Sequence, residues 1–144
     1  MLKGLPAMLG PDLLSTLRAM GHGDEIAIVD ANYPADAHAT RLVRMDGHDV
    51  PAIADALLSV LPLDRDVDAA FRPCAHGDCD RMEPVYSEFD ALLARHEPGI
   101  VLRPLPGDGF YARVRGCYAI IASGERRLFA NIILRKGVIG PVES

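Results

Sequence analysis

The stretch Glu25-Ile26-Ala27-Ile28-Val29-Asp30 decides the fold. It holds four consecutive apolar residues without polar alternation, which is typical of a strand covered on both faces. Residues 118–122, Tyr-Ala-Ile-Ile-Ala, have the same character, and residues 100–103 and 130–134 are two further short apolar runs. A sheet that is buried on both faces needs helices on either side of it, so these runs predict an α/β fold.

Three helices are predicted between those strands. Residues 11–20 begin with a proline suited to a first helical position, repeat leucines at helical spacing and are expected to end at Gly21. Residues 51–61, with Asp49 as N-cap, and residues 84–96 each carry an apolar stripe. The remaining segments are expected to be a strand at 41–45, loops at 35–40 and 104–109, a loop containing at most one strand at 64–83, and an ambiguous stretch at 110–116.

Length and composition fit one compact unit. The chain has 144 residues, 49% of them hydrophobic and 24% charged, and we expect residues 1–144 to form a single layered domain with a central, mostly buried sheet and flanking helices. The net charge of -5 would repel a phosphate backbone, so we expect no nucleic-acid partner. No apolar run is long enough for a membrane span, and glycines and prolines interrupt the first eleven residues, so we expect a cytoplasmic protein.

The three cysteines predict a reduced protein. An odd count in a chain of this size argues against a disulfide framework. Cys74, His76 and Cys79 are ligand types for a metal, but their spacing matches no common zinc pattern, so we expect an exposed loop and no metal. Metal binding by these three residues stays open as an alternative. Cys117 precedes an apolar strand and is expected to be a small core residue.

His22 and Asp30 are the candidate chemical groups. His22 stands between Gly21 and Gly23 in a connection from helix to strand, where histidine suits proton transfer near neutral pH. Asp30 ends the buried strand, at a position where ligand crevices form in α/β folds, although Asp30-Ala31-Asn32 also suits a turn. If the two residues lie at opposite ends of the strand, they can act together only through another element or another subunit.

The chain resembles the L-fucose mutarotase and D-ribose pyranase family of small sugar-anomer enzymes, and fits the fucose branch better. The resemblance spans nearly the whole chain and is weakest at 66–83. The segments that carry it are Met1–Gly4, Pro11–Leu14, Met20–Ile26, Asp30–Ala35, Leu61–Asp64, Phe110–Arg113, Gly124–Arg126 and Asn131–Val138. It implies an isomerase that interconverts the α and β anomers of a free sugar, here L-fucose, without metal or organic cofactor, and that assembles as a ring, expected to be a decamer.

The resemblance also implies site residues. His22 falls at the position of the proton donor. The positions that contact the sugar fall on Asp30, Asp64, Tyr111, Arg113, Phe129 and Asn131. Position 129 departs from the pattern, because family members usually have tyrosine there. This loses one hydrogen bond to the sugar and keeps open the alternative of a non-catalytic sugar-binding accessory protein. A second alternative is a D-ribose pyranase, which would exchange pyranose and furanose forms at the same site.

Overall fold

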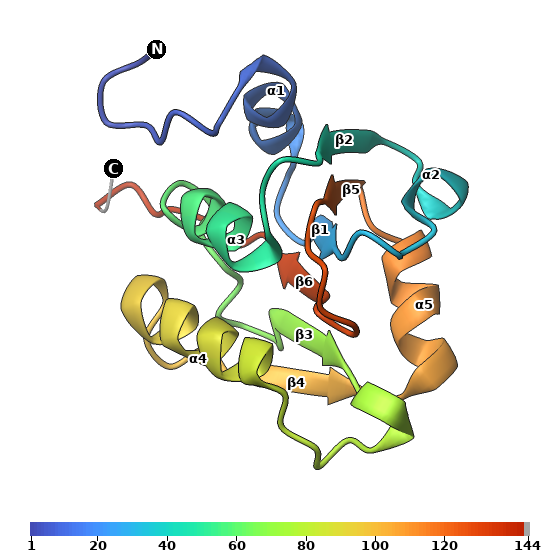
Figure 1. Ribbon diagram of the computed structural model, residues 1–144. Helices are drawn as coiled ribbons and strands as arrows, with labels where there is room; N and C mark the ends of the chain where they lie inside the picture. The colour runs from blue at the N-terminus through green and yellow to red at the C-terminus, as the bar shows by residue number, and fades with distance from the viewer. Residues whose placement is uncertain (143–144) are drawn as a thin grey trace.

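The structure is a computed structural model and describes residues 1–142. Its elements alternate along the chain (Figure 1). The helices are α1 Pro11–Ala19, α2 Ala35–His38, α3 Val50–Leu58, α4 Pro84–His96 and α5 Gly107–Arg115, with a short 3₁₀ turn, η1, at Ala75–Gly77. The strands are β1 Glu25–Val29, β2 Leu42–Met45, β3 Ala70–Pro73, β4 Leu102–Leu105, β5 Ala119–Ser123 and β6 Ile132–Arg135. No helix within residues 1–142 has the length and apolar character needed to cross a membrane.

The six strands form one mixed sheet in the order β2-β5-β1-β6-β3-β4. Parallel pairing joins β1 and β2 to β5, and β3 to β4, whereas β6 runs antiparallel to both of its neighbours. Because of this direction, the first residues of β6 lie beside the last residues of β1 and β3, at the same end of the strands. At this end of the strands, segments that are about a hundred residues apart in the sequence lie next to each other.

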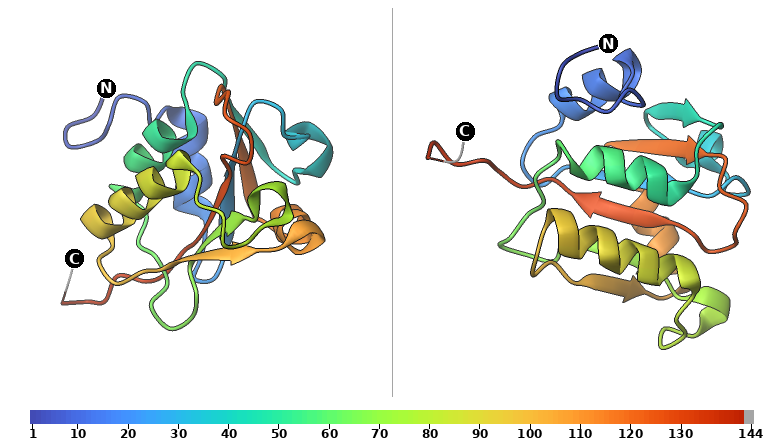
Figure 2. Two further views of the ribbon diagram at one scale, coloured as in Figure 1. Left: turned by 60° about the horizontal axis from the view of Figure 1, so that its bottom comes forward. Right: turned by 60° about the vertical axis from the view of Figure 1, so that its left-hand side comes forward.

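Side chains of β1 alternate between two cores. Ile26 and Ile28 belong to the core beneath α1, α3 and α4, whereas Ala27 and Val29 belong to the core beneath α2 and α5. Figure 2 shows these helices in separate layers on the two sides of the sheet. The α/β prediction with a buried central sheet and flanking helices is confirmed, because each residue of the apolar run has a core to enter.

The strongest sequence patterns place their elements well. The predicted helix 84–96 coincides with α4, and β1, β5 and α3 lie within three residues of their predicted bounds. Asp49 caps α3 as expected, since its side chain accepts a hydrogen bond from the N–H of Ala52 at 2.8 Å. The single strand allowed within 64–83 is β3.

Three predictions about local structure were wrong. Residues 35–38 form α2, a single helical turn too short to produce a periodic pattern. Residues 107–115 form α5, whose glycine-rich start favours a loop although Phe110 and Val114 are buried on one face. β4 lies two residues later than predicted and contains Pro104, which this strand tolerates because it is at the sheet edge.

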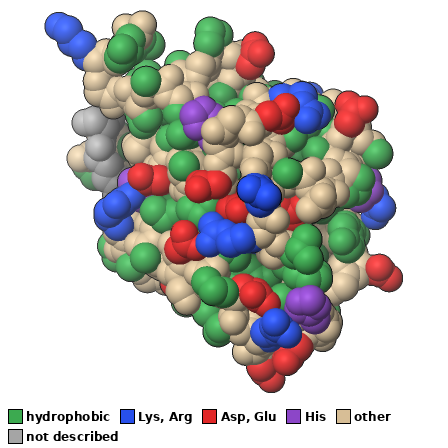
Figure 3. All heavy atoms as spheres, viewed as in Figure 1, with side chains coloured by type: hydrophobic (Ala, Val, Ile, Leu, Met, Phe, Trp, Pro, Cys, Tyr) green, Lys and Arg blue, Asp and Glu red, His purple; other side chains and the backbone are tan. Residues whose placement is uncertain are grey.

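Charged side chains of both signs are interspersed on the face seen in Figure 3. Several form ion pairs between elements, including Arg127 with Glu88 of α4 and Arg95 of α4 with Asp55 of α3. Exposed pairs of this kind contribute little stability each, so the fold depends mainly on its two apolar cores.

Gly124 provides a test of packing at the edge of the sheet. A Cβ atom there would lie 2.0 Å from the backbone oxygen of Asp46, whereas at Gly109 in α5 it would meet nothing within 4 Å. We expect Gly124→Ala to lower the free energy of unfolding by about 3 kcal/mol or more, at the upper end of overpacking costs. Gly109→Ala should change it by less than about 1 kcal/mol, or raise it. Equal urea midpoints for the two variants would contradict the observed packing.

Candidate active site

His22 forms a hydrogen-bonded pair with Asp64 at the amino end of β1. Its Nε2 lies 3.1 Å from Oδ2 of Asp64. The His22 side chain is 49% exposed and that of Asp64 only 3%, so a buried carboxylate supports an accessible imidazole. The end of β6 brings the two loops together: the N–H of Gly23 donates to the oxygen of Lys136 at 2.9 Å, and the N–H of Asp64 donates to the oxygen of Arg135 at 3.0 Å.

Both oxygens of the Asp64 carboxylate have partners within the chain. Its Oδ1 accepts from the N–H of Asp66 at 3.0 Å, and its Oδ2 accepts from Nε of Arg135 at 3.0 Å as well as contacting His22. The bond from Asp66, followed by those from Arg135 and His22, lowers the pKa of Asp64 even though burial opposes the charge. Asp64 is therefore held ionised beside the imidazole.

Arg113 belongs to this same end of the sheet. Its guanidinium donates two hydrogen bonds to Glu25, at 2.8 and 2.6 Å, and lies 3.7 Å from the ring centre of Phe71. Arg135 also pairs with Glu25, at 3.5 Å. A cavity of about 590 Å³ opens beside these three residues. We call His22, Asp64, Glu25, Arg113 and Arg135 the His22 end.

Asp30 lies at the opposite end of β1 and is buried. Its N–H donates to Oδ1 of Asn131 at 2.7 Å, and its Oδ1 accepts from the N–H of Asn32 at 2.8 Å. Burial raises the pKa of Asp30, and the hydrogen bonds from Asn32 and Asn131 offset this only in part. A cavity of about 350 Å³ adjoins Asp30 and is also lined by Tyr33 and Ser123.

The other predicted contact residues surround this second end. Phe129 precedes Asn131 by two residues, and its carbonyl accepts a hydrogen bond from the Tyr86 hydroxyl at 2.9 Å. The exposed Tyr111 ring stacks on Tyr33, with ring centres 5.6 Å apart. We call Asp30, Asn131, Phe129, Tyr33 and Tyr111 the Asp30 end.

The predicted site residues thus form two groups within one chain. His22, Asp64 and Arg113 lie at one end of β1, and Asp30, Tyr111, Phe129 and Asn131 lie at or near the other. The strand from Glu25 to Asp30 spans roughly 17 Å at about 3.3 Å per residue, too far for a hydrogen bond between His22 and Asp30. This is the arrangement in which the two residues can act together only through another element or another subunit.

Sequence reasoning missed Arg135 and Glu125. Arg135 links Asp64 and Glu25, but in the sequence it marks only the end of an apolar strand. Glu125 is 3% exposed and ion-paired with Arg127, and it contributes to the raised pKa of Asp30. A charged residue beside Gly124 reads as an exposed turn, so no local signal indicated its burial.

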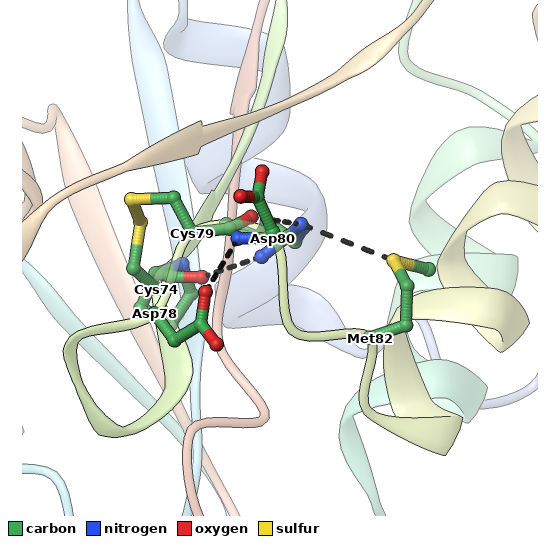
Figure 4. The surroundings of a disulfide bond; sticks show 7 residues. Cys74, Asp78, Cys79, Asp80 and Met82 are labelled. Atoms are coloured by element: carbon green, nitrogen blue, oxygen red, sulfur yellow. Dashed lines mark hydrogen bonds between the residues drawn. A yellow bond between two sulfur atoms is a disulfide. The ribbon is translucent and has the colours of Figure 1, made fainter.

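The alternative metal site was wrong. Cys74 and Cys79 are joined in a disulfide, with Cα atoms 4.3 Å apart, so neither offers a thiolate (Figure 4). The expectation of reduced cysteines was also wrong for this pair, because η1 folds the intervening residues into a turn that brings the two together. Cys117 is buried as predicted, and burial raises its pKa to about 12.

One other group of potential metal ligands occurs in the described part of the chain. Ligand atoms of His22, Asp64 and Asp66 all lie within 4.8 Å of one another. The Arg135 guanidinium already donates to Asp64 there, and its positive charge would oppose a bound cation. This arrangement suits proton transfer better than metal coordination.

The structure is that of a small α/β protein that carries an exposed imidazole at one end of a buried strand and a buried carboxyl group at the other. The sequence pattern of the RbsD / FucU transport protein family matches residues 3–139. The chain belongs to this family, as its resemblance predicted.

Individual relatives agree with that assignment. The fucose mutarotase of Homo sapiens is 39% identical over 145 residues, covering 96% of this chain and 94% of the relative. The structure of the fucose mutarotase from Streptococcus pneumoniae in complex with L-fucose is 39% identical, covers 96% of this chain and 100% of that one, and has a TM-score of 0.88. Bacillus subtilis RbsD complexed with D-ribose, at 21% identity, 97% and 100% coverage and a TM-score of 0.72, shares the fold.

The two aspartates predict opposite dependences of stability on pH. Because the pKa of Asp64 is lowered, its charge contributes stability that is present at pH 7 and is lost as pH falls through its folded-state pKa. We expect Asp64→Asn to be less stable than the parent at pH 7, with the difference shrinking towards pH 3. Urea unfolding at several pH values measures it.

Asp30 supplies the matched control. Because its pKa is raised, its stability contribution is full below its unfolded-state pKa and is lost as pH rises through the folded-state value. Asp30→Asn keeps an acceptor for Asn32 and should be more stable than the parent at pH 7, with that gain disappearing in acid. Two variants that change stability in the same direction at pH 7 would contradict these assignments.

Proposed function

We propose that this protein is a fucose mutarotase, an isomerase that interconverts the α and β anomers of free L-fucose without a cofactor, and that residues 1–144 form one such domain. The observation that carries the proposal is the similarity to the Streptococcus pneumoniae fucose mutarotase solved with L-fucose, which is 39% identical over 96% of this chain. The human relative, equally similar in sequence, supports the same activity.

The reaction needs only proton transfers. A base removes the proton of the anomeric hydroxyl while an acid protonates the ring oxygen, and the C1–ring-oxygen bond breaks to give the open aldehyde. Rotation about C1–C2 and the reverse transfers close the ring as the other anomer. One acid and one base, each contributing about 10²–10⁴-fold, are sufficient.

We assign the ring-oxygen proton to His22. Nε2 keeps its hydrogen in the bond to the ionised Asp64, and Nδ1 of the imidazolium gives its proton to the ring oxygen. The neutral ring that remains takes this proton back when the sugar closes again. Since the oxygens of Asp64 already have protein partners, we propose that Asp64 positions His22 and does not bind sugar itself. Arg113, bound twice by Glu25, similarly holds the His22 end together.

Asp30 is the proposed partner acid–base group at the anomeric hydroxyl. Its carboxyl is buried and its pKa is raised, which brings it closer to the pH at which it can both accept and release a proton. Asn131 offers a donor and an acceptor for sugar hydroxyls, and Tyr111 adds a hydroxyl and an apolar ring face. Phe129 provides a ring face only.

A complete site requires two subunits. The His22 end of one copy must face the Asp30 end of the next, and a head-to-tail contact of this kind, repeated with closure, makes a ring. We therefore propose a homo-oligomer, specifically a decameric ring, with sites between neighbouring copies. A cytoplasmic location stays a prediction, since the Cys74–Cys79 disulfide removes the cysteine count that supported it.

A D-ribose pyranase is the second candidate. The fold shared with the Bacillus subtilis protein solved with D-ribose favours it, and the lower identity of 21% weighs against it. A non-catalytic sugar-binding protein is the third candidate, suggested by the missing phenol at Phe129. Saturation-transfer NMR with L-fucose and D-ribose separates the three: anomer exchange of fucose supports the mutarotase, pyranose–furanose exchange of ribose the pyranase, and binding without exchange the third.

Substitution of His22 tests the proton donor. We expect His22→Ala to lower the rate of L-fucose anomer exchange by about 10²–10⁴-fold, because the variant lacks the group that we assign to protonate the ring oxygen. His96→Ala is the control, since His96 pairs with Asp55 of α3 and belongs to neither end. Normal exchange by a correctly assembled His22→Ala protein would remove His22 from the mechanism.

Mixed oligomers test the two-subunit site. His22→Ala and Asp30→Asn should each be nearly inactive alone, but subunits unfolded together and refolded at equal amounts should recover about a quarter of the parental activity, because a quarter of the contacts join two intact ends. Light scattering should give an oligomer for every sample. No recovery in a mixed oligomer of the parental size would contradict a shared site.

Phe129→Tyr tests the departure from the family pattern. A phenol can add one neutral hydrogen bond to the sugar, worth roughly 0.5–1.5 kcal/mol, so KM for L-fucose should fall severalfold with little change in kcat. A loss of activity would mean that the pocket is shaped around Phe129 for a different sugar.

A further inference from the structure

The loop closed by the Cys74–Cys79 disulfide lies at the same end of the strands as Asp30. β3 pairs antiparallel with β6, with Ala70 opposite Leu134 and Phe71 opposite Ile133. Continuing this register places Pro73, the last residue of β3, opposite Asn131. The residues that follow β3, Cys74 to Cys79, therefore adjoin those that precede β6, including Phe129.

His76 and Phe129 contact each other across this junction. Their ring centres lie 4.7 Å apart with the planes at 59°. Both residues have positive φ, 55° and 58°, and they are the only non-glycine residues with positive φ in the described chain. This backbone conformation is unfavourable for bulky residues and persists where surrounding structure imposes it, commonly at ligand sites.

Neighbouring contacts fix the positions of both His76 and Phe129. The disulfide closes the loop that carries His76 (Figure 4). The buried Arg72 guanidinium donates to the oxygen of Cys79 at 3.1 Å and lies 4.4 Å from the ring centre of Tyr86. The hydroxyl of Tyr86 in turn donates to the carbonyl of Phe129 at 2.9 Å. One connected set of contacts thus fixes the loop and Phe129 relative to each other.

We propose that His76 is a further sugar-contacting residue that helps determine specificity at the Asp30 end, and that the Cys74–Cys79 disulfide positions it. The inference rests on the proposed function and extends it to a segment where the family resemblance is weakest. Phe129 offers an apolar face but no polar atom. The exposed imidazole beside it has one donor and one acceptor in its neutral form, and these supply the hydroxyl contact that a tyrosine at 129 would make.

His76→Phe is the central variant, because it keeps a ring against Phe129 and removes both nitrogens. Saturation-transfer NMR gives kcat and KM for L-fucose exchange, and NMR titration gives Kd. We expect a two- to tenfold rise in KM and Kd, the range of a single neutral hydrogen bond, with kcat unchanged. His48→Phe, the same substitution on an exposed turn, is the control. Unchanged KM and Kd in a folded His76→Phe protein would overturn the proposal.

A double-variant cycle separates a sugar contact from a structural role. The rise in KM and Kd caused by His76→Phe should be smaller in a Phe129→Tyr background, because the phenol then makes a hydrogen bond to the same sugar hydroxyl. An equal rise in both backgrounds would overturn the proposal. If the proposed function is wrong, the unmodified protein will not exchange anomers of L-fucose. The ratio of Kd between His76→Phe and the unmodified protein will still report whether His76 contacts the sugar.

Reduction tests the role of the disulfide. Dithiothreitol should raise KM of the unmodified protein and leave that of His76→Phe unchanged, because the disulfide acts through the position of the imidazole. Thiol titration confirms reduction, and the Cys74→Ser/Cys79→Ser protein controls for other effects of the reagent. An equal rise in the His76→Phe protein would overturn the positioning role.

Discussion

The burial of β1 on both faces is the constraint on which the rest of the structure depends. The strand pairs with β5 from Ile26 to Val29 and with β6 from Glu25 to Ile28, and every apolar side chain enters one of two cores. Polar side chains along β1 itself would remain unsatisfied. Functional groups are therefore confined to its two ends, where His22 and Asp30 lie, and the loops of neighbouring strands supply their partners.

The two ends give their carboxylates contrasting environments. Asp64 is surrounded by donors and is held ionised, whereas Asp30 is buried with fewer compensating bonds and resists ionisation. The ionised Asp64 can therefore hold the His22 imidazole in place, whereas the raised pKa of Asp30 suits a group that exchanges a proton itself. Separation by a full strand keeps the two environments independent, and it is the reason why the proposed site draws on two copies of the chain.

Prediction from sequence succeeded where a pattern was long and failed where the signal was short or non-local. The thirteen residues of α4 carry an unambiguous apolar stripe, whereas the four residues of α2 show no period. The strand β4 accepts Pro104 only because it lies at an edge, which depends on the strand order. The pairing of Cys74 with Cys79 depends on the turn at η1, so a count of cysteines could not reveal it.

The sequence by itself determined the layered α/β class, the burial of β1 and the place of His22 in the connection before this strand, because apolar runs and glycine placement are local properties. Only the tertiary structure decided which groups meet. His22 pairs with Asp64 across 42 positions and Asp30 with Asn131 across 101. Those pairings follow from the order β2-β5-β1-β6-β3-β4 and the antiparallel direction of β6. Strand order is set by the packing of the whole chain, so no single segment of the sequence encodes it.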